Sequence, residues 1–126
     1  MTQKSRRPVF LDITRIHLPV TAVISITHRI TGVLFFISIP LLVYTFGLSL
    51  SSQDGYDRIL SMLDHRAARL IFILLLWGFA HHFLAGIRYL FIDIDIGVSR
   101  ESSRMSAWYV VAGGIVVLFG SAVFLL

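Results

Sequence analysis

The stretch HHFLAGIRYLFID, from His81 to Asp93, places ionisable side chains inside a segment that is otherwise suited only to lipid. Titratable residues at membrane depth are costly, and their presence there indicates a function. At about 100° per residue, His82 shares a helix face with several small residues and, further along, with an aromatic and an acidic one. The residues on that face are Gly78, Ala85, Gly86, Tyr89 and Asp93. The pattern predicts a histidine in a trough of small residues.

A trough of this shape can receive a large planar ligand edge-on, and imidazole is a standard axial ligand of haem iron. His81 precedes His82 by one residue, so its side chain points about 100° away, on the face of Trp77 and Arg88. The two adjacent histidines therefore cannot serve one iron. The alternative interpretation is that His82 forms a hydrogen bond across a helix interface and the small residues only let two helices approach closely.

Composition identifies a membrane protein. Of the 126 residues, 56% are hydrophobic and 14% charged, which leaves too little polar surface for a soluble domain. The net charge of +4 is concentrated near the N-terminus beside a hydrophobic span, a pattern typical of cytoplasmic anchoring rather than of nucleic-acid binding. The chain has no Cys, which excludes both a disulfide framework and a protein-ligated iron–sulfur cluster.

The distribution of charge predicts an all-α membrane protein with three transmembrane helices in a single domain, residues 1–126. No charged residue occurs between Ile30 and Gln53, a run long enough to span a membrane. The predicted segments are a cytoplasmic arm at 1–21 and helices at about 22–50, 67–92 and 105–126. Residues 51–66 form a mixed loop in which YDRILSML favours a short interfacial helix. The arm's positive charge puts the N-terminus in the cytoplasm and the C-terminus in the periplasm.

This topology brings the polar residues of two helices to one depth. If the second helix starts outside, His82 lies about 15 residues in, or roughly 22 Å along it, in the cytoplasmic half of the bilayer. The first helix runs the other way. Its polar residues, Ser25, His28 and Arg29, therefore fall in the same range of depth.

Three chemical roles suit these residues. His28 is the other candidate in the chain for a second axial ligand, the alternative being a histidine of a partner subunit, and spacing does not choose between them. His28 and Arg29 could instead meet the haem propionates. Ser25 and Arg29, one turn apart, offer the hydroxyl and cation needed to hold a quinone carbonyl. The structural alternatives are helix capping or packing for Ser25 and snorkelling toward lipid phosphates for Arg29.

Two of the motifs also resemble those of a known family. The cytochrome b membrane-anchor subunit of bacterial succinate dehydrogenase (respiratory complex II) resembles this chain in RPVFLDITRIHLPVTAVISITHRITG and in HHFLAGIRYLFID one helix later. The resemblance covers nearly the whole chain. It includes the early RP, the SxxHR(I/V)(S/T)G motif that opens the first helix, the SLSS loop and the HxxxGIR…D motif of the second.

The resemblance implies a role for each candidate residue. His82, four residues before Gly86 in HxxxGIR, would be the axial haem ligand of this subunit. The family takes the second ligand from a smaller anchor subunit, which implies that His28 and Arg29 meet the propionates. It further implies that Ser25 and Arg29 line the ubiquinone site beside the iron–sulfur subunit.

The chain departs from the family pattern at Tyr89, where some relatives have a second histidine, so no propionate contact is assigned there. His81 corresponds to a variable aromatic position and is not assigned to iron. The expected protein is a subunit of the bacterial inner membrane that anchors the flavoprotein and iron–sulfur subunits, where succinate is oxidised, and that shares haem b and ubiquinone with its partners. Two alternatives remain open: a single-chain cytochrome ligated by His28 and His82, and a structural anchor without cofactor.

Overall fold

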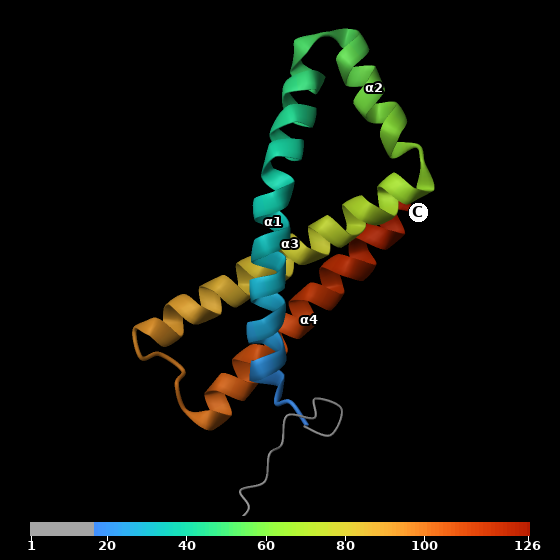
Figure 1. Ribbon diagram of the computed structural model, residues 1–126. Helices are drawn as coiled ribbons and strands as arrows, with labels where there is room; N and C mark the ends of the chain where they lie inside the picture. Colours follow the sequence, from blue (N-terminus) through green and yellow to red (C-terminus); the bar gives the residue numbers. More distant parts are fainter. Residues whose placement is uncertain (1–16) are drawn as a thin grey trace, which may run out of the picture.

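Four helices joined by short turns make up the structure (Figure 1). The computed structural model describes residues 17–126, so most of the predicted cytoplasmic arm lies outside the described residues. The helices are α1 (Val20–Ser51), α2 (Gln53–Leu63), α3 (Arg66–Asp93) and α4 (Arg100–Leu125). Of these, α1, α3 and α4 are long and apolar enough to cross a membrane, which confirms the three predicted spans.

The first helix begins directly after a proline. Pro19 is its N-cap, and the Pro19 carbonyl accepts hydrogen bonds from the backbone N–H groups of Ala22 and Val23. Proline is well suited to a helix start because its missing N–H would have no partner within the helix there. The helix continues through Pro40 and ends where Ser52 adopts an extended conformation. With 32 residues, α1 is about 48 Å long, which exceeds the roughly 30 Å hydrocarbon core.

Side-chain caps set the starts of α2 and α4. The Ser52 hydroxyl accepts from the Gly55 N–H, so α2 begins at Gln53, three residues before the helix predicted for the loop. The Ser99 hydroxyl likewise accepts from the Ser102 N–H, and α4 begins at Arg100. The predicted start near Met105 was therefore wrong by five residues, because a polar but capped first turn precedes the apolar run.

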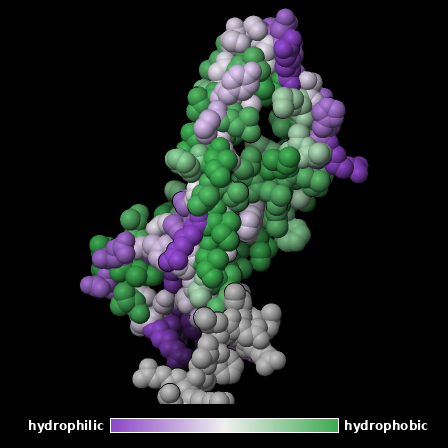
Figure 2. All heavy atoms as spheres, in the orientation of Figure 1, coloured by the Kyte–Doolittle hydropathy of each residue, from purple (hydrophilic) through white to green (hydrophobic). Residues whose placement is uncertain are grey.

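The spans do not form a parallel bundle. In Figure 1, α3 and α4 run side by side as an antiparallel hairpin, and α1 crosses over them. The small core lies at this crossing, where Ala85 of α3 and Ala107 of α4 are fully buried beside Ile24 of α1. Figure 2 shows hydrophobic atoms over the middle of the molecule and hydrophilic ones toward its two ends.

The α3–α4 turn reverses the chain with two residues in the left-handed region. Asp95 has φ 61° and Gly97 has φ 75°. Aspartate tolerates this conformation better than most residues, and glycine adopts it without steric cost. Across this turn, Arg88 near the end of α3 lies opposite Ser106 in α4.

Candidate functional site

The crossing of α1 and α3 brings two predicted residues into contact. The imidazole rings of His28 and His82 are stacked, with centroids 4.2 Å apart and planes inclined by 10°. The Nδ1 atom of His82 lies 3.1 Å from the His28 carbonyl oxygen and 3.2 Å from the Thr31 hydroxyl oxygen. The predicted equal depth of His28 and His82 is therefore confirmed.

These two contacts define which nitrogen of His82 carries the proton. A carbonyl oxygen can only accept, so Nδ1–H donates to His28. The Thr31 hydroxyl donates to the carbonyls of Thr27, at 2.9 Å, or His28, at 3.0 Å, and its oxygen is free to accept from the same Nδ1–H. In the neutral ring, Nε2 then keeps its lone pair. Metal-ligating histidines characteristically have this arrangement, in which the nitrogen remote from the metal donates to a carbonyl.

Glycines allow the two helices to approach closely enough for this contact. A Cβ at Gly32 would lie 3.1 Å from Cε1 of His82, and one at Gly86 would lie 3.6 Å from Nε2 of His28. At Gly78 a Cβ would meet Phe35 and Thr31, both at 3.8 Å. The predicted trough of small residues therefore exists, and side chains of α1 lie along it.

His81 lies on the other face of α3, as predicted, and is only 4% exposed. Its ring lies 5.8 Å from that of Trp77, and its Nε2 has no hydrogen-bond partner within residues 17–126. A Cβ at Gly114 of α4 would approach Nε1 of Trp77 to 3.2 Å. At Trp77, this face of α3 therefore packs against α4.

Arg88 continues this face and links α3 to α4. Its Nε donates to the Ser106 hydroxyl at 3.0 Å, and its Nη2 donates to the Ser103 carbonyl at 3.1 Å and hydroxyl at 2.8 Å. The guanidinium also lies 5.3 Å from the ring centroid of Tyr89. Arg88 is 7% exposed. The sequence placed Arg88 on the face of His81 and Trp77, and the structure shows that it joins α3 to α4 through hydrogen bonds.

Tyr89 of α3 is a second aromatic neighbour of His28, after His82. The two ring centroids are 5.2 Å apart, and the Tyr89 hydroxyl is buried without a hydrogen-bond partner among the described residues. A buried phenol normally finds a partner. Tyr89 therefore belongs to the surroundings of the histidine pair, although the sequence alone assigned it no contact.

Ser25 and Arg29 are placed differently from His28. Ser25 is half-buried, whereas Arg29 is exposed on the outer side of α1, where it lines a shallow apolar hollow with Ile30 and Val33. His28 turns inward to α3 and Arg29 turns outward. The structure thus brings His28 to His82 but leaves Arg29 facing whatever surrounds the chain.

The geometry of the histidine pair does not suit both imidazoles as ligands of one haem iron. An iron with two axial imidazoles lies between them, one on each face of the porphyrin, so the rings meet end-on across the metal. Rings stacked face to face at 4.2 Å leave no room for a porphyrin between them. Within residues 17–126, no group of three or more His, Cys, Asp or Glu side chains is arranged to hold a metal ion.

Sequence reasoning assigned no role to Thr31 and Gly32, although both belong to the SxxHR(I/V)(S/T)G motif, and it missed the serines that bind Arg88. Thr31 could have been found, because it follows His28 by three residues and so shares its face in an otherwise apolar run. The serine pair, Ser103 and Ser106, lay within or beside the segment that hydropathy assigned to a turn. Their pairing with Arg88 depends on the register of two helices, which no local pattern reveals.

These features define the class of the protein as a multi-pass helical membrane subunit with a histidine site at a helix crossing. The chain belongs to the succinate dehydrogenase/fumarate reductase transmembrane subunit family, whose pattern matches residues 3–122. Family membership also makes it a protein of the bacterial inner membrane. The resemblance seen in the sequence motifs is thereby confirmed.

Three similar proteins from different bacteria share the name succinate dehydrogenase cytochrome b556 subunit. The chain is 34% identical over 119 residues to the succinate dehydrogenase cytochrome b556 subunit of Coxiella burnetii, covering 92% of this chain and 95% of the relative. It is 31% identical to the subunit of the same name from Rickettsia bellii, over 85% of this chain and 83% of the relative. The Paracoccus denitrificans subunit is 26% identical, with 90% and 88% covered.

Proposed function

We propose that this chain is the larger of two membrane anchors of a succinate:quinone oxidoreductase and that His82 supplies one axial ligand to a haem b. The observation that carries the proposal is the position of His82 Nδ1 within hydrogen-bond distance of two oxygen atoms of α1. Its Nδ1–H is held by the His28 carbonyl and Thr31, which leaves the Nε2 lone pair available to iron. When bound, the haem supplies a one-electron carrier at the membrane level of the complex.

His28 and Arg29 are proposed to receive the haem propionates. His28 is stacked on the ligand ring itself, and Arg29 follows it by one residue at the same depth. Charge-assisted hydrogen bonds from a guanidinium would hold the carboxylates and neutralise them. Because Arg29 faces away from α3, this role requires the porphyrin edge to extend toward the outer side of α1.

A second anchor subunit is proposed to supply the other haem histidine. The stacked geometry makes His28 unsuitable as the opposite ligand, which supports a ligand from outside the chain. With no Cys in the sequence, any iron–sulfur clusters that deliver electrons would be held by an iron–sulfur subunit, and a flavoprotein subunit would oxidise succinate. The N-terminus would lie in the cytoplasm, beside these subunits.

Ser25 and Arg29 are proposed to bind ubiquinone. The Ser25 hydroxyl can donate to a quinone carbonyl, and the exposed guanidinium of Arg29 stabilises the negative charge that builds on the ring oxygen as electrons arrive. Two electrons and two protons then convert the quinone to quinol. The half-buried position of Ser25 beside the exposed Arg29 supports a site at the boundary between α1 and a partner subunit.

The ligand assignment is tested by haem content. The purified complex of the His82→Ala variant should lose its haem or show an altered haem spectrum in a pyridine haemochrome assay, whereas His28→Ala should retain haem with a shifted spectrum. Equal loss in both variants would favour a bis-histidine site within this chain. Unchanged haem content in the His82→Ala variant would mean that the chain is a purely structural anchor.

The quinone assignment is tested by separating two activities of the same complex. Ser25→Ala and Arg29→Ala should lower succinate:ubiquinone reductase activity about tenfold or more, while succinate oxidation by an artificial dye that takes electrons from the soluble subunits stays unchanged. Thr27→Val is the matched control, because its hydroxyl lies on the same helix and bonds only to the Val23 carbonyl within the described residues. Normal ubiquinone turnover in both variants would refute the site.

A further inference from the structure

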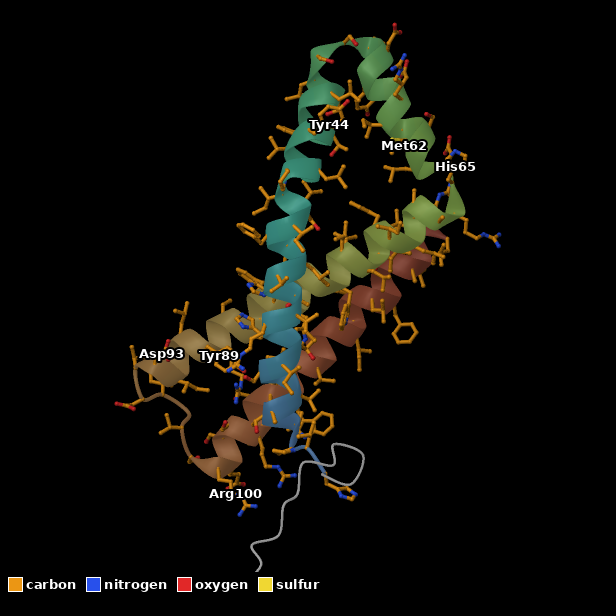
Figure 3. All side chains as sticks on the ribbon, in the orientation of Figure 1. Tyr44, Met62, His65, Tyr89, Asp93 and Arg100 are labelled. Atoms are coloured by element: carbon orange, nitrogen blue, oxygen red, sulfur yellow. The ribbon has the colours of Figure 1, made fainter. Side chains whose placement is uncertain are left out.

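A cavity of about 600 Å³ lies where α1 and α4 begin, apart from the histidine pair. Its walls include Leu18 and Val20 from the start of α1, and Arg100, Arg104 and Trp108 from the first turns of α4. Both spans start here, so the cavity lies at the level where a membrane-spanning chain meets the polar interface. Figure 3 shows Arg100 at the end of the molecule opposite to Tyr44 and His65.

The two arginines stand where a helix disfavours cations. Arg100 is the first residue of α4, and Arg104 follows it by one turn on the same face. The N-terminus of a helix carries partial positive charge, and like charges four residues apart repel each other. Glu101 lies in the same turn, yet within residues 17–126 no acidic group comes within 4.0 Å of either arginine, since the one ion pair there joins Arg69 and Asp64 at 3.6 Å.

An anion in the cavity would remove this electrostatic cost. The charged side chains that line the cavity are the two arginines, and no acidic residue lines it. Apart from Thr21 and Ser103 the other lining residues are apolar, and Trp108 is an aromatic of the kind that favours the membrane–water interface. A ligand that fits must therefore carry a negative head beside a long apolar body.

We propose that this cavity binds an anionic phospholipid, with its phosphate between Arg100 and Arg104 and its acyl chains against Leu18, Val20 and Trp108. Basic pockets between transmembrane helices are a recognised class of site for anionic lipid headgroups. The lipid would join the starts of α1 and α4. This inference does not depend on haem or quinone binding.

The test is native mass spectrometry of the purified complex titrated with phosphatidylglycerol. The double variant R100Q/R104Q should bind this lipid about thirtyfold more weakly, since each interfacial arginine contributes roughly a fivefold factor. The matched control R58Q/R66Q removes the same charge from exposed positions near α2 and the start of α3 and should bind normally. R100K/R104K keeps the charge and should retain most of the affinity.

Two further arms identify the ligand. Phosphatidylcholine should bind at least tenfold more weakly than phosphatidylglycerol, and millimolar inorganic phosphate should not displace the lipid, because phosphate lacks the acyl chains. If R100Q/R104Q fails to assemble, the single variants R100Q and R104Q should each show about the fivefold loss. Lipid binding that is equal in R100Q/R104Q and R58Q/R66Q would overturn the proposal, and would mean that polypeptide fills the cavity or that the arginines act only in membrane insertion.

Discussion

At the scale of single residues, Thr31 and Gly32 determine how His82 sits against α1. Thr31 contributes a hydroxyl oxygen 3.2 Å from Nδ1, and Gly32 leaves the space that Cε1 occupies. Neither residue belongs to the types usually searched for as ligands, and hydropathy treats both as part of an apolar run. The sequence predicted that small residues lie beside His82, and the structure places α1 against them. It did not predict the groups that contact the His82 ring, because these come from another helix.

The Thr31→Val variant tests the hydroxyl at constant shape. Val cannot accept from Nδ1–H, and we expect a loss of about 1 kcal/mol in the free energy of unfolding, together with a shifted haem spectrum. The measurement is a denaturant titration in detergent micelles followed by a reduced-minus-oxidised spectrum. Thr27→Val, which removes a hydroxyl bonded within α1, should leave the spectrum unchanged. A shift of equal size in both would contradict the assignment.

Gly32→Ala and Gly47→Ala form a second pair on the same helix. A methyl group at Gly47 meets nothing within 4 Å, so Ala should stabilise the helix by up to about 1 kcal/mol. At Gly32 the methyl group comes to 3.1 Å from His82 and must displace the ring. We expect lower haem content in Gly32→Ala alone, measured by haemochrome assay. Full haem in that variant would show that the ring is free to move.

At the scale of helices, the starts and ends were predicted well where hydropathy changes sharply. They were predicted poorly where a side-chain cap sets the first residue of the helix. The observed bounds of α1 and α3 differ from those predicted by one or two residues. In contrast, α4 gains a polar first turn, Arg100–Arg104, because the Ser99 cap satisfies a backbone donor there. That turn matters for function, since it carries Ser103 and both arginines of the cavity.

The buried guanidinium of Arg88 joins α3 to α4, because its planar group donates to two serines at once. Arg88→Lys keeps the charge but cannot donate to Ser103 and Ser106 at once, and we expect it to cost about 2 kcal/mol of unfolding free energy. Arg66→Lys, at an exposed position, is the control and should be neutral. The measurement is denaturant unfolding in micelles. A neutral Arg88→Lys would show that charge alone holds the helices.

At the scale of the whole molecule, the two halves of α1 differ. Its first half crosses α3 and α4 and carries the core residue Ile24, whereas side chains of its second half, such as Val43, Phe46 and Leu50, are between 64% and 70% exposed. The polar groups of that half bond to the helix itself, as Thr45 does to the Leu41 carbonyl. Such a surface suits lipid or another membrane helix. The sequence could predict its apolar character but not how much of it stays uncovered by residues 17–126.

The proposed topology can be tested because the chain has no native Cys. A single Cys introduced at Met62, on exposed α2, should react with a membrane-impermeant maleimide added to intact spheroplasts, since this end is proposed to face the periplasm. A Cys at Ser102, at the start of α4, should react only in inverted membrane vesicles. The reverse pattern would place the N-terminus outside and would also remove the proposed site from the side of the iron–sulfur subunit.

The carbonyl that accepts from the His82 ring is a main-chain group of residue 28 and not part of its side chain. Every amino acid carries that carbonyl, so substitutions at position 28 can alter what the imidazole there does without releasing the His82 ring. The role of the carbonyl and the role of the side chain at this position can therefore change independently. The side chain at position 28 can be replaced during evolution, whereas the main-chain carbonyl that contacts His82 remains as long as the helix is kept.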